Sequence, residues 1–479
     1  MKNPVVLSIV IFFYAVSADA NGPLTLSLDE AILLAVRSNP NVQSSQLSYL
    51  AQKFNLSVQE WNFYPHYSFQ ASALYTRSGT PGTPINSGEN YFIQPGVSLL
   101  TPIGTQLQLT STNSLAGHYN PGISLQVMQP LLRGFGRAGV EAALNNAKDT
   151  EVIACLTIEG LLQNTVSAVI NAYLNIVSAE KIILIDEDAL KRAEKSVEQT
   201  KLFIKAGHKA GNELVTVEAN VASAKSQLIN DQNNLLQARY ALLAAIGIDP
   251  NSSLHFSSLN IQRLIKKYSL PTLTQTKKMV LNNDIQYQID NITLHGSTTR
   301  SLLLAEDNTR WQLNFNANVA TGKGYGGGVN AGMNSLFNGA NQSQSVGLTL
   351  QVPIDDQLAK QGVINAKIAL KQAELALMQE KWNKETSAIT GWNLVISAER
   401  SLHFAEDAEK LQNKTYNISF QKYLHGLIDS LELQSAQIQL IQAQQTLLYA
   451  QINYLKALVN LDLLIGNTLK TWHVMVRTS

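Results

Sequence analysis

Two glutamates stand at places in the chain where a carboxylate could act on ions. Glu213 follows Gly207 by six residues, and Glu432 follows Gly426 at the same spacing, 219 residues further on. A carboxylate in the first turn after a glycine is stabilised by the helix dipole. Carboxylates that a symmetry axis brings together attract cations and resist simultaneous ionisation. A helix-starting charge and an ion-attracting site are therefore both open interpretations.

Other residue types that support catalysis or metal binding are scattered. The eight histidines form no spaced cluster with Asp, Glu or Cys, and no nucleophile elbow follows a strand pattern. The glycine-rich segment 322–328 lacks the Ser or Thr and the following helix of a phosphate-binding loop. The single cysteine, Cys155, excludes an intramolecular disulfide. We therefore predict a protein that is not an enzyme and has no metal and no cofactor.

The residues after Glu432 predict a long helix packed against a partner helix. Large and small residues alternate at spacings of three and four, which is a heptad seam. The seam residues are Leu433, Ala436, Leu440, Ala443, Leu447, Ala450, Tyr454, Ala457, Leu461 and Leu464. Alanine at every second seam position allows close approach of the two backbones.

The same pattern occurs twice, so the chain is predicted to be an internal duplication. With an offset of 219 residues, Gly207 matches Gly426 and Leu228 matches Leu447. The predicted organisation begins with a signal peptide at 1–20 and a first repeat at 21–247, which contains strands about 67–129 and a helical hairpin about 139–247. A linker at 248–272 leads to a second repeat at 273–466, which contains strands about 312–352 and a hairpin about 358–466. A tail at 467–479 follows. Helices of some 65 residues would be roughly 100 Å long.

Composition and hydropathy indicate which partners are expected and which kind of membrane span the chain could form. The net charge is +1 and charged residues make up 15% of the 479, so nucleic acid is not an expected partner. Lys2, an apolar run and Ala18-Asp19-Ala20 are typical of a secretory signal peptide. After it we find no run of about 18 apolar residues, so a membrane span is expected to consist of strands.

Segments with a period of two indicate strands. From Tyr67 to Tyr75 apolar and polar residues alternate, and 96–101, 105–112, 123–129, 312–321 and 345–352 are also strand-like. Segments 77–90 and 322–342 are rich in turn residues and are predicted to be loops. Such strands fit a transmembrane barrel or a soluble sheet with one buried face. The signal peptide favours the barrel.

This arrangement resembles the TolC-type outer-membrane efflux protein family over nearly the whole mature chain. The resemblance is carried by LSLDEAILLAVRSNP at 26–40, QPLLRGFG at 129–136, and the two hairpin tips at 203–218 and 423–437. It implies a mixed α and β fold, mainly α, in which a homotrimer forms a 12-stranded transmembrane barrel continuous with a helical periplasmic barrel. Each chain would supply four strands. The additional strand-like segments of the first repeat leave six strands per chain as an alternative.

The resemblance also implies two groups of site residues near the tips. They are a periplasmic gate of Glu432, Glu213 and Tyr423, and adaptor-contacting tips at Gly207, His208, Gly426 and Ile428. Two positions depart from the family pattern. Ser435 stands where a second acid can occur, and Ile428 stands where a basic residue is common. A doubled acidic ring and a salt-bridge lock are therefore not expected.

The implied function is an exit duct for efflux of small molecules or for type I protein secretion. Its location would be the outer membrane of a Gram-negative bacterium, with the helical part in the periplasm. The expected partners are two further copies of the chain, a periplasmic membrane-fusion or adaptor protein, an inner-membrane transporter of the ABC, RND or MFS type, and outer-membrane lipid. The alternative is a periplasmic coiled-coil scaffold or adaptor without a pore. Adaptors carry one helical hairpin, whereas this sequence predicts strands in both repeats.

Overall fold

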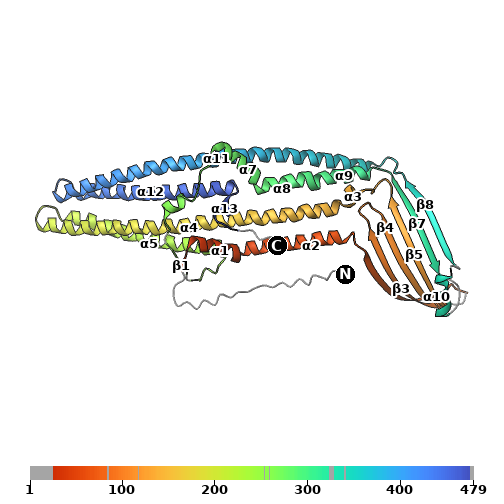
Figure 1. Ribbon diagram of the computed structural model, residues 1–479. Coiled ribbons are helices and arrows are strands. Elements are labelled where there is room, and N and C mark those ends of the chain that lie inside the picture. The colour runs from red at the N-terminus through yellow and green to blue at the C-terminus, as the bar shows by residue number, and fades with distance from the viewer. Residues whose placement is uncertain are drawn as a thin grey trace. The chain divides into compact units, whose positions relative to one another are not determined.

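The computed structural model describes residues 25–82, 86–116, 118–252, 254–257, 259–322, 328–338 and 341–474, and they are mostly helical with antiparallel strands (Figure 1). The predicted signal peptide, residues 323–327 of the glycine-rich segment and the last five residues of the tail lie outside this description. The mainly α, mixed α and β class is confirmed.

Two compact units make up the chain, and each consists of three separate segments. The first unit contains the residues up to Asn39, Thr165–Ser269 and Val395–Val459, and the second contains Pro40–Asn164, Leu270–Leu394 and the residues from Asn460. These units do not coincide with the two predicted repeats, because each unit takes segments from both. The boundaries of the repeats remain a prediction.

Long helices occur within the two predicted hairpins. The two hairpins consist of α4 (Ala142–Lys205) with α5 (Asn212–Ile246), and of α11 (Gln357–Leu424) with α12 (Ser430–Leu464). Most seam residues of α12 are buried, and the others are half-buried. Gly247 and Gly466 follow the returning helices with positive φ angles of 86° and 71°, a conformation that glycine adopts without steric cost.

The predicted helix over 28–63 is interrupted at Asn39, as the Asn39-Pro40 pair suggests. It forms α1 (Leu28–Ser38) and α2 (Pro40–Trp61). The corresponding part of the second repeat forms α7 (Leu273–Asn283), α8 (Ile285–Thr293), the π-helical turn η1 (Leu294–Thr298) and α9 (Thr299–Asn308). Shorter elements are β1 (Thr25–Leu26), β6 (His255–Phe256), α3 (Arg137–Val140), α6 (Ile261–Ile265) and α13 (Thr468–Thr471).

Equivalent hydrogen bonds recur in the two repeats. Ser27 and Glu30 form a capping box at the start of α1, and Thr272 and Gln275 form one at the start of α7. The side-chain amide of Asn39 donates to the Ala245 carbonyl at 3.0 Å. That of Asn283 donates to the Ile465 carbonyl at 2.9 Å. Such recurrence is what an internal duplication would produce.

One stretch within α4 is long and apolar enough to cross a membrane by length and composition alone. The expectation that no such stretch follows the signal peptide therefore needs correction. Its apolar character has a structural reason, because α4 supplies buried core residues such as Val166, Val169 and Ile170. The core helix of a protein carries the same composition as a membrane span.

Six strands of the second unit form one antiparallel sheet with the order β2-β3-β4-β5-β7-β8. Their bounds are β2 His66–Ser78, β3 Asn86–Leu100, β4 Gln106–Ala116, β5 His118–Pro130, β7 Gln312–Gly322 and β8 Gln342–Gln351. The four strands per chain implied by the resemblance, and with them a total of twelve in a trimer, are therefore corrected. The alternative of six strands is the one observed.

Two predicted loops contain regular structure. Residues 86–90 belong to β3, and Asn86 pairs with Ser78 and Gly88 with Thr76. Pairing with β2 overrides the local preference of Asn, Ser and Gly for turns. The segment between β7 and β8 contains the helix α10 (Val329–Phe337).

The two faces of the sheet differ in polarity. Leu109 pairs with Leu125, which pairs with Val319, and these apolar side chains share one face. Gln108 pairs with Gln126, which pairs with Asn318, on the other face. Within the six described strands, this polar face carries no Asp, Glu, Lys or Arg. The predicted alternation is thus confirmed as an apolar face and a neutral polar face.

Candidate functional site

The tips of both hairpins are built in the same way and lie in the first unit. Gly207 and Gly426 have positive φ angles of 72° and 68°. The N–H of His208 donates to the Phe203 carbonyl at 2.8 Å, and the N–H of Leu427 donates to the Lys422 carbonyl at 2.9 Å. These bonds satisfy the free carbonyls at the ends of α4 and α11. The tip glycines therefore have a structural role in reversing the chain.

Tyr423 connects the two hairpins near their tips. Its ring is fully buried. The Thr200 hydroxyl donates to the Ser196 carbonyl at 2.7 Å, so the Tyr423 hydroxyl, 2.7 Å from Thr200, is the donor of the second bond. The ring of Phe203 meets that of Tyr423 edge to face, with centroids 5.7 Å apart. A side chain of α11 is thereby attached to α4.

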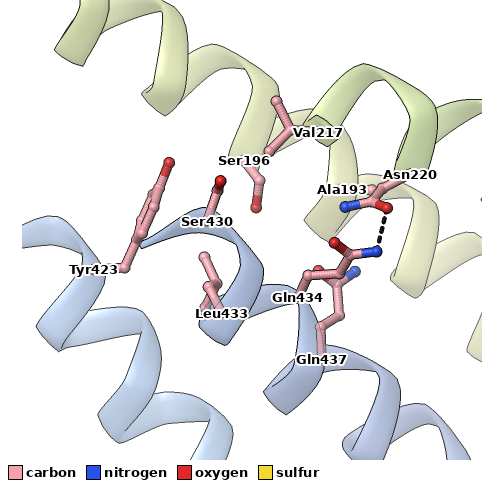
Figure 2. Close-up of a pocket in the computed structure, with 9 residues that line it drawn as sticks. All are labelled: Ala193, Ser196, Val217, Asn220, Tyr423, Ser430, Leu433, Gln434 and Gln437. Carbon is pink, nitrogen blue, oxygen red and sulfur yellow. Dashed lines mark hydrogen bonds between the residues drawn. The ribbon is translucent and has the colours of Figure 1, made fainter. Parts of the chain in front are cut away.

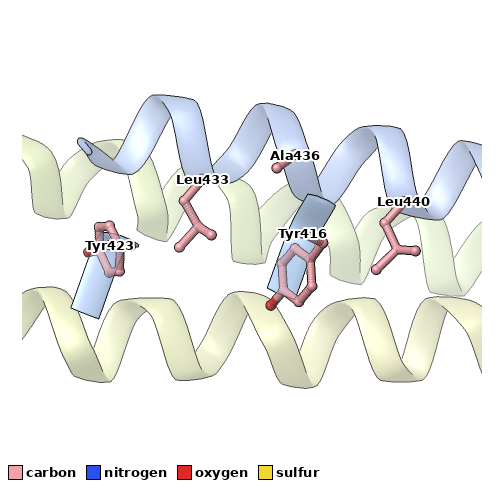
Figure 3. Packing of buried hydrophobic residues seen from close by; sticks show 5 residues of the cluster. All are labelled: Tyr416, Tyr423, Leu433, Ala436 and Leu440. Atoms are coloured by element: carbon pink, nitrogen blue, oxygen red, sulfur yellow. The ribbon is translucent and has the colours of Figure 1, made fainter. Parts of the chain in front are cut away.

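An apolar cluster surrounds this tyrosine (Figure 3). It consists of Tyr416, Tyr423, Leu433, Ala436 and Leu440, with Phe203, Phe420 and Ile428 packed against it. Figure 3 shows Tyr416 and Tyr423 of α11 lying between α4 and α12. Ile428, predicted as an adaptor contact, is half-buried against this cluster, whereas His208 is exposed.

Glu213 is joined to Tyr423 through Lys209. The Lys209 Nζ lies 2.8 Å from a Glu213 carboxylate oxygen and 4.2 Å from the centre of the Tyr423 ring. Only 8% of the Lys209 side chain is exposed, so its charge is largely shielded from water at this site. Lys209 and Thr200 are members of this contact network that the sequence did not reveal. The spacing of four between Lys209 and Glu213 was the one available signal.

Glu432 is separate from this network. It lies exposed in the first turn of α12, and its backbone N–H donates to the Asp429 carboxylate at 2.8 Å. Across the part of the chain that the structure describes, we find no hydrogen bond or ion pair of the Glu432 carboxylate itself. The structure thus brings Tyr423 and Glu213 together and leaves Glu432 free to meet ions or another chain.

A small pocket with a mixed polar and apolar lining lies beside Tyr423 between the two hairpins (Figure 2). The Gln434 amide of α12 donates to the Asn220 side chain of α5. The Gln437 amide donates to the Ala189 carbonyl of α4 at 3.0 Å. Polar contacts of this kind can be exchanged for water, so the hairpins are joined at the tips by an apolar contact flanked by replaceable hydrogen bonds.

Further along the first hairpin, Asp186 of α4 and Asp231 of α5 form a buried pair of acids. Burial and the neighbouring Asp231 raise the pKa of Asp186 to about 7. Burial opposes ionisation of Asp231 as well, but hydrogen bonds from Asp186, Gln227 and Asn234 outweigh it and lower the pKa of Asp231. The pair therefore holds one proton in the folded protein at mildly acidic pH.

Replacing Asp186 with Asn is expected to stabilise the protein at pH 8. The folded protein keeps a proton on Asp186 up to about pH 7, whereas the unfolded chain loses it near pH 4, so stability falls as pH rises across this interval. We expect Asp186→Asn to remove a loss on the order of 1–2 kcal/mol per chain. The melting temperature measured from pH 5 to pH 8 tests this. Asp188→Asn, on the exposed side of α4, is the matched control. Parallel pH profiles for wild type and Asp186→Asn would contradict the prediction.

Long helical hairpins and an antiparallel sheet with one apolar and one neutral polar face are combined in this chain, and this architecture agrees with the family comparison. The sequence profile of the family described as outer membrane efflux protein matches residues 32–248 and 308–467. The chain belongs to this family, and the resemblance to TolC-type proteins is confirmed.

Solved structures with a similar fold include a protein described as forming a transmembrane channel, an outer membrane protein and an outer membrane channel. CusC is 15% identical, with 94% of this chain and 95% of CusC covered and a TM-score of 0.72. VceC from Vibrio cholerae is 13% identical, with 93% of this chain and 95% of VceC covered and a TM-score of 0.69. The open state of the MtrE channel of Neisseria gonorrhoeae is 16% identical, with 92% and 89% covered and a TM-score of 0.69. No match was found among proteins with curated functions.

Proposed function

We propose that this protein is the outer-membrane exit duct of an efflux or type I secretion system and works as a homotrimer in a Gram-negative bacterium. The single observation that carries the proposal is the sheet with one apolar and one neutral polar face. An apolar face suits lipid, and a neutral polar face suits a water-filled lumen through which cargo of either charge can pass. A coiled-coil scaffold without a pore has no need for such a sheet.

The edges of the sheet support assembly with further copies. β2 and β8 are the edge strands, and their residues are almost all exposed. Open strand edges are not tolerated in lipid. Because six antiparallel strands separate into three up and three down, β8 of one chain can pair antiparallel with β2 of the next. Three chains of six strands each would close a barrel of eighteen strands.

The tips are proposed to form the gate and the adaptor contact. Glu432 is exposed and would form a ring of three carboxylates in a trimer, while Glu213 acts through Lys209 on the closing contact of Tyr423. Gly207, His208 and Gly426 are exposed at the tips, next to exposed apolar side chains such as Leu427 and Leu431. Such apolar residues suit docking of a periplasmic adaptor, which would connect the duct to an inner-membrane transporter of the ABC, RND or MFS type.

Single-channel recording in planar lipid bilayers tests both the pore and the gate. We expect wild type to give discrete cation-selective steps that Mg²⁺ blocks, because carboxylates brought together bind divalent ions. Glu432→Gln is expected to weaken the block by about tenfold in Mg²⁺ concentration. Asp429→Asn, at the neighbouring cap, is the control for a general loss of negative charge. If Glu432→Gln gives conductance steps that Mg²⁺ blocks as it does in wild type, the protein is a channel and Glu432 is not part of its gate. If folded trimers give no steps, even after the tips are opened by mutation of Tyr423, the scaffold without a pore is favoured.

A further inference from the structure

The helix α10 lies on the apolar face of the sheet, at the end remote from α9 (Figure 1). Tyr119 of β5 contacts α10. It pairs with Leu115 of β4, and both side chains lie on the same face of the sheet as Leu109 and Leu125. The Thr321 hydroxyl donates to the Leu336 carbonyl at 3.1 Å, and Thr321 pairs with Ile123 on that face. The helix thus covers the face that is proposed to meet lipid and leaves the polar face open.

Close packing fixes α10 in this place. A side chain at Gly332 would lie 2.7 Å from the ring of Tyr119, and one at Gly322 would lie 2.7 Å from Leu336. Such distances are too short for any larger residue, so the two glycines permit the contact. The position of α10 is therefore determined by the sequence of the sheet as well as by its own.

The outward side of α10 is apolar along one stripe. Val329, Met333 and Phe337 are spaced by four residues and are 62%, 44% and 79% exposed. Asn330 and Asn334, also exposed, lie beside them, and the helix contains no charged residue. An exposed apolar stripe of this kind marks a contact surface for lipid or protein, and a helix without charged residues can enter the acyl-chain boundary without burying an ion.

The stripe lies on the side of α10 that is nearer the middle of the strands. The Tyr119 hydroxyl donates to the Asn113 side chain at 2.8 Å, and Asn113 lies two residues nearer the middle of β4 than Leu115, the partner of Tyr119. The tip of Tyr119 therefore points toward the middle. The Met333 sulfur lies 3.8 Å from that hydroxyl, so the Met333 side of the helix points the same way.

We propose that α10 is an interfacial anchor that inserts Val329, Met333 and Phe337 into the acyl-chain boundary of the outer leaflet. This inference rests on the proposed function, because it requires the apolar face of the sheet to be in lipid. Tyr75 and Tyr91 are exposed on the same face and toward the same end, as expected of the aromatic belt at a membrane interface. The anchor would fix the depth of the barrel and hold α10 outside the lumen.

Fluorescence quenching in vesicles tests the anchor. Single cysteines are introduced at Phe337, Val329 and Asn334 in a Cys155→Ser background and labelled with bimane, and the full-length trimer is reconstituted in phosphatidylcholine with acyl-brominated lipid. We expect brominated lipid to quench the labels at 337 and 329 about threefold more strongly than the label at 334. Iodide in the water should quench 334 more strongly. The two positions on the stripe guard against failure of one variant to fold.

Labels at Leu125 and Gln126 separate the two proposals. Quenching by brominated lipid at 125 and not at 126 is expected if the apolar face is in lipid. Quenching at 125 without quenching at 337 and 329 would overturn the anchor and keep the duct. Absence of lipid quenching at 125 would overturn the proposed function itself. Labels at 337 and 329 that neither bromolipid nor iodide reaches would show that protein covers the stripe, and this too would overturn the lipid anchor.

Discussion

Tyr423→Ala is expected to open the tips and raise single-channel conductance. The substitution removes the edge-to-face contact with Phe203, the hydrogen bond to Thr200 and the ring beneath Lys209. Truncating a fully buried aromatic ring costs about 3 kcal/mol. If separated tips lack this contact, the ratio of closed to open tips falls by about 100-fold per chain. Bilayer recording at matched protein concentration measures the change in open probability and in conductance.

Two further variants separate opening from general destabilisation. Tyr423→Phe removes the hydroxyl alone, and Thr200 keeps its bond to Ser196, so we expect a smaller shift of about 1 kcal/mol. Tyr416→Ala truncates a ring of the same cluster, about two turns of α11 before Tyr423. It should lower the melting temperature to a similar degree and open the tips less. Equal opening by Tyr416→Ala and Tyr423→Ala would assign the effect to stability and exclude a specific gate contact.

Local periodicity predicted most of the fold. The heptad seam predicted α12, and Ser27 with Glu30 predicted the start of α1, because both depend on neighbours three or four residues away. Strand-like segments were also predicted within all six strands of the sheet, two of them from clear alternation, while the family resemblance implied four. Here the residues were more informative than the analogy, since strand-like patterns are local and can be recognised one segment at a time.

Features that depend on distant parts of the chain were not predictable in this way. Residues 86–90 are strand because β2 pairs with them, although their composition is typical of a loop. Lys209 belongs to the tip network because packing of α11 brings Tyr423 beneath its ammonium group. A spacing within one short stretch of chain carries no record of a ring that comes from another hairpin. The gate residues predicted from the sequence therefore include Glu213 but not Lys209, which connects Glu213 to Tyr423.

Arginine at two adjacent positions of β5 is expected to give opposite results. Leu125 points to the apolar face between Leu109 and Val319, so Leu125→Arg would place a charge in lipid at a cost of about 2–4 kcal/mol per chain. Three such charges in a trimer should strongly reduce the heat-resistant trimer in outer-membrane fractions. Gln126→Arg points to the polar face between Gln108 and Asn318, where water can hydrate the charge.

Gln126→Arg should therefore assemble normally and alter the channel. Three arginines on the polar face would shift selectivity toward anions, because charges lining a lumen set which ions enter it. Trimer yield and reversal potential in a salt gradient measure the two effects separately. Normal assembly of Leu125→Arg with loss of Gln126→Arg would mean that the faces are the reverse of those proposed. Equal loss of both would mean that both faces are packed against protein, as in a soluble sheet, and the duct would then have no wall of its own in the membrane.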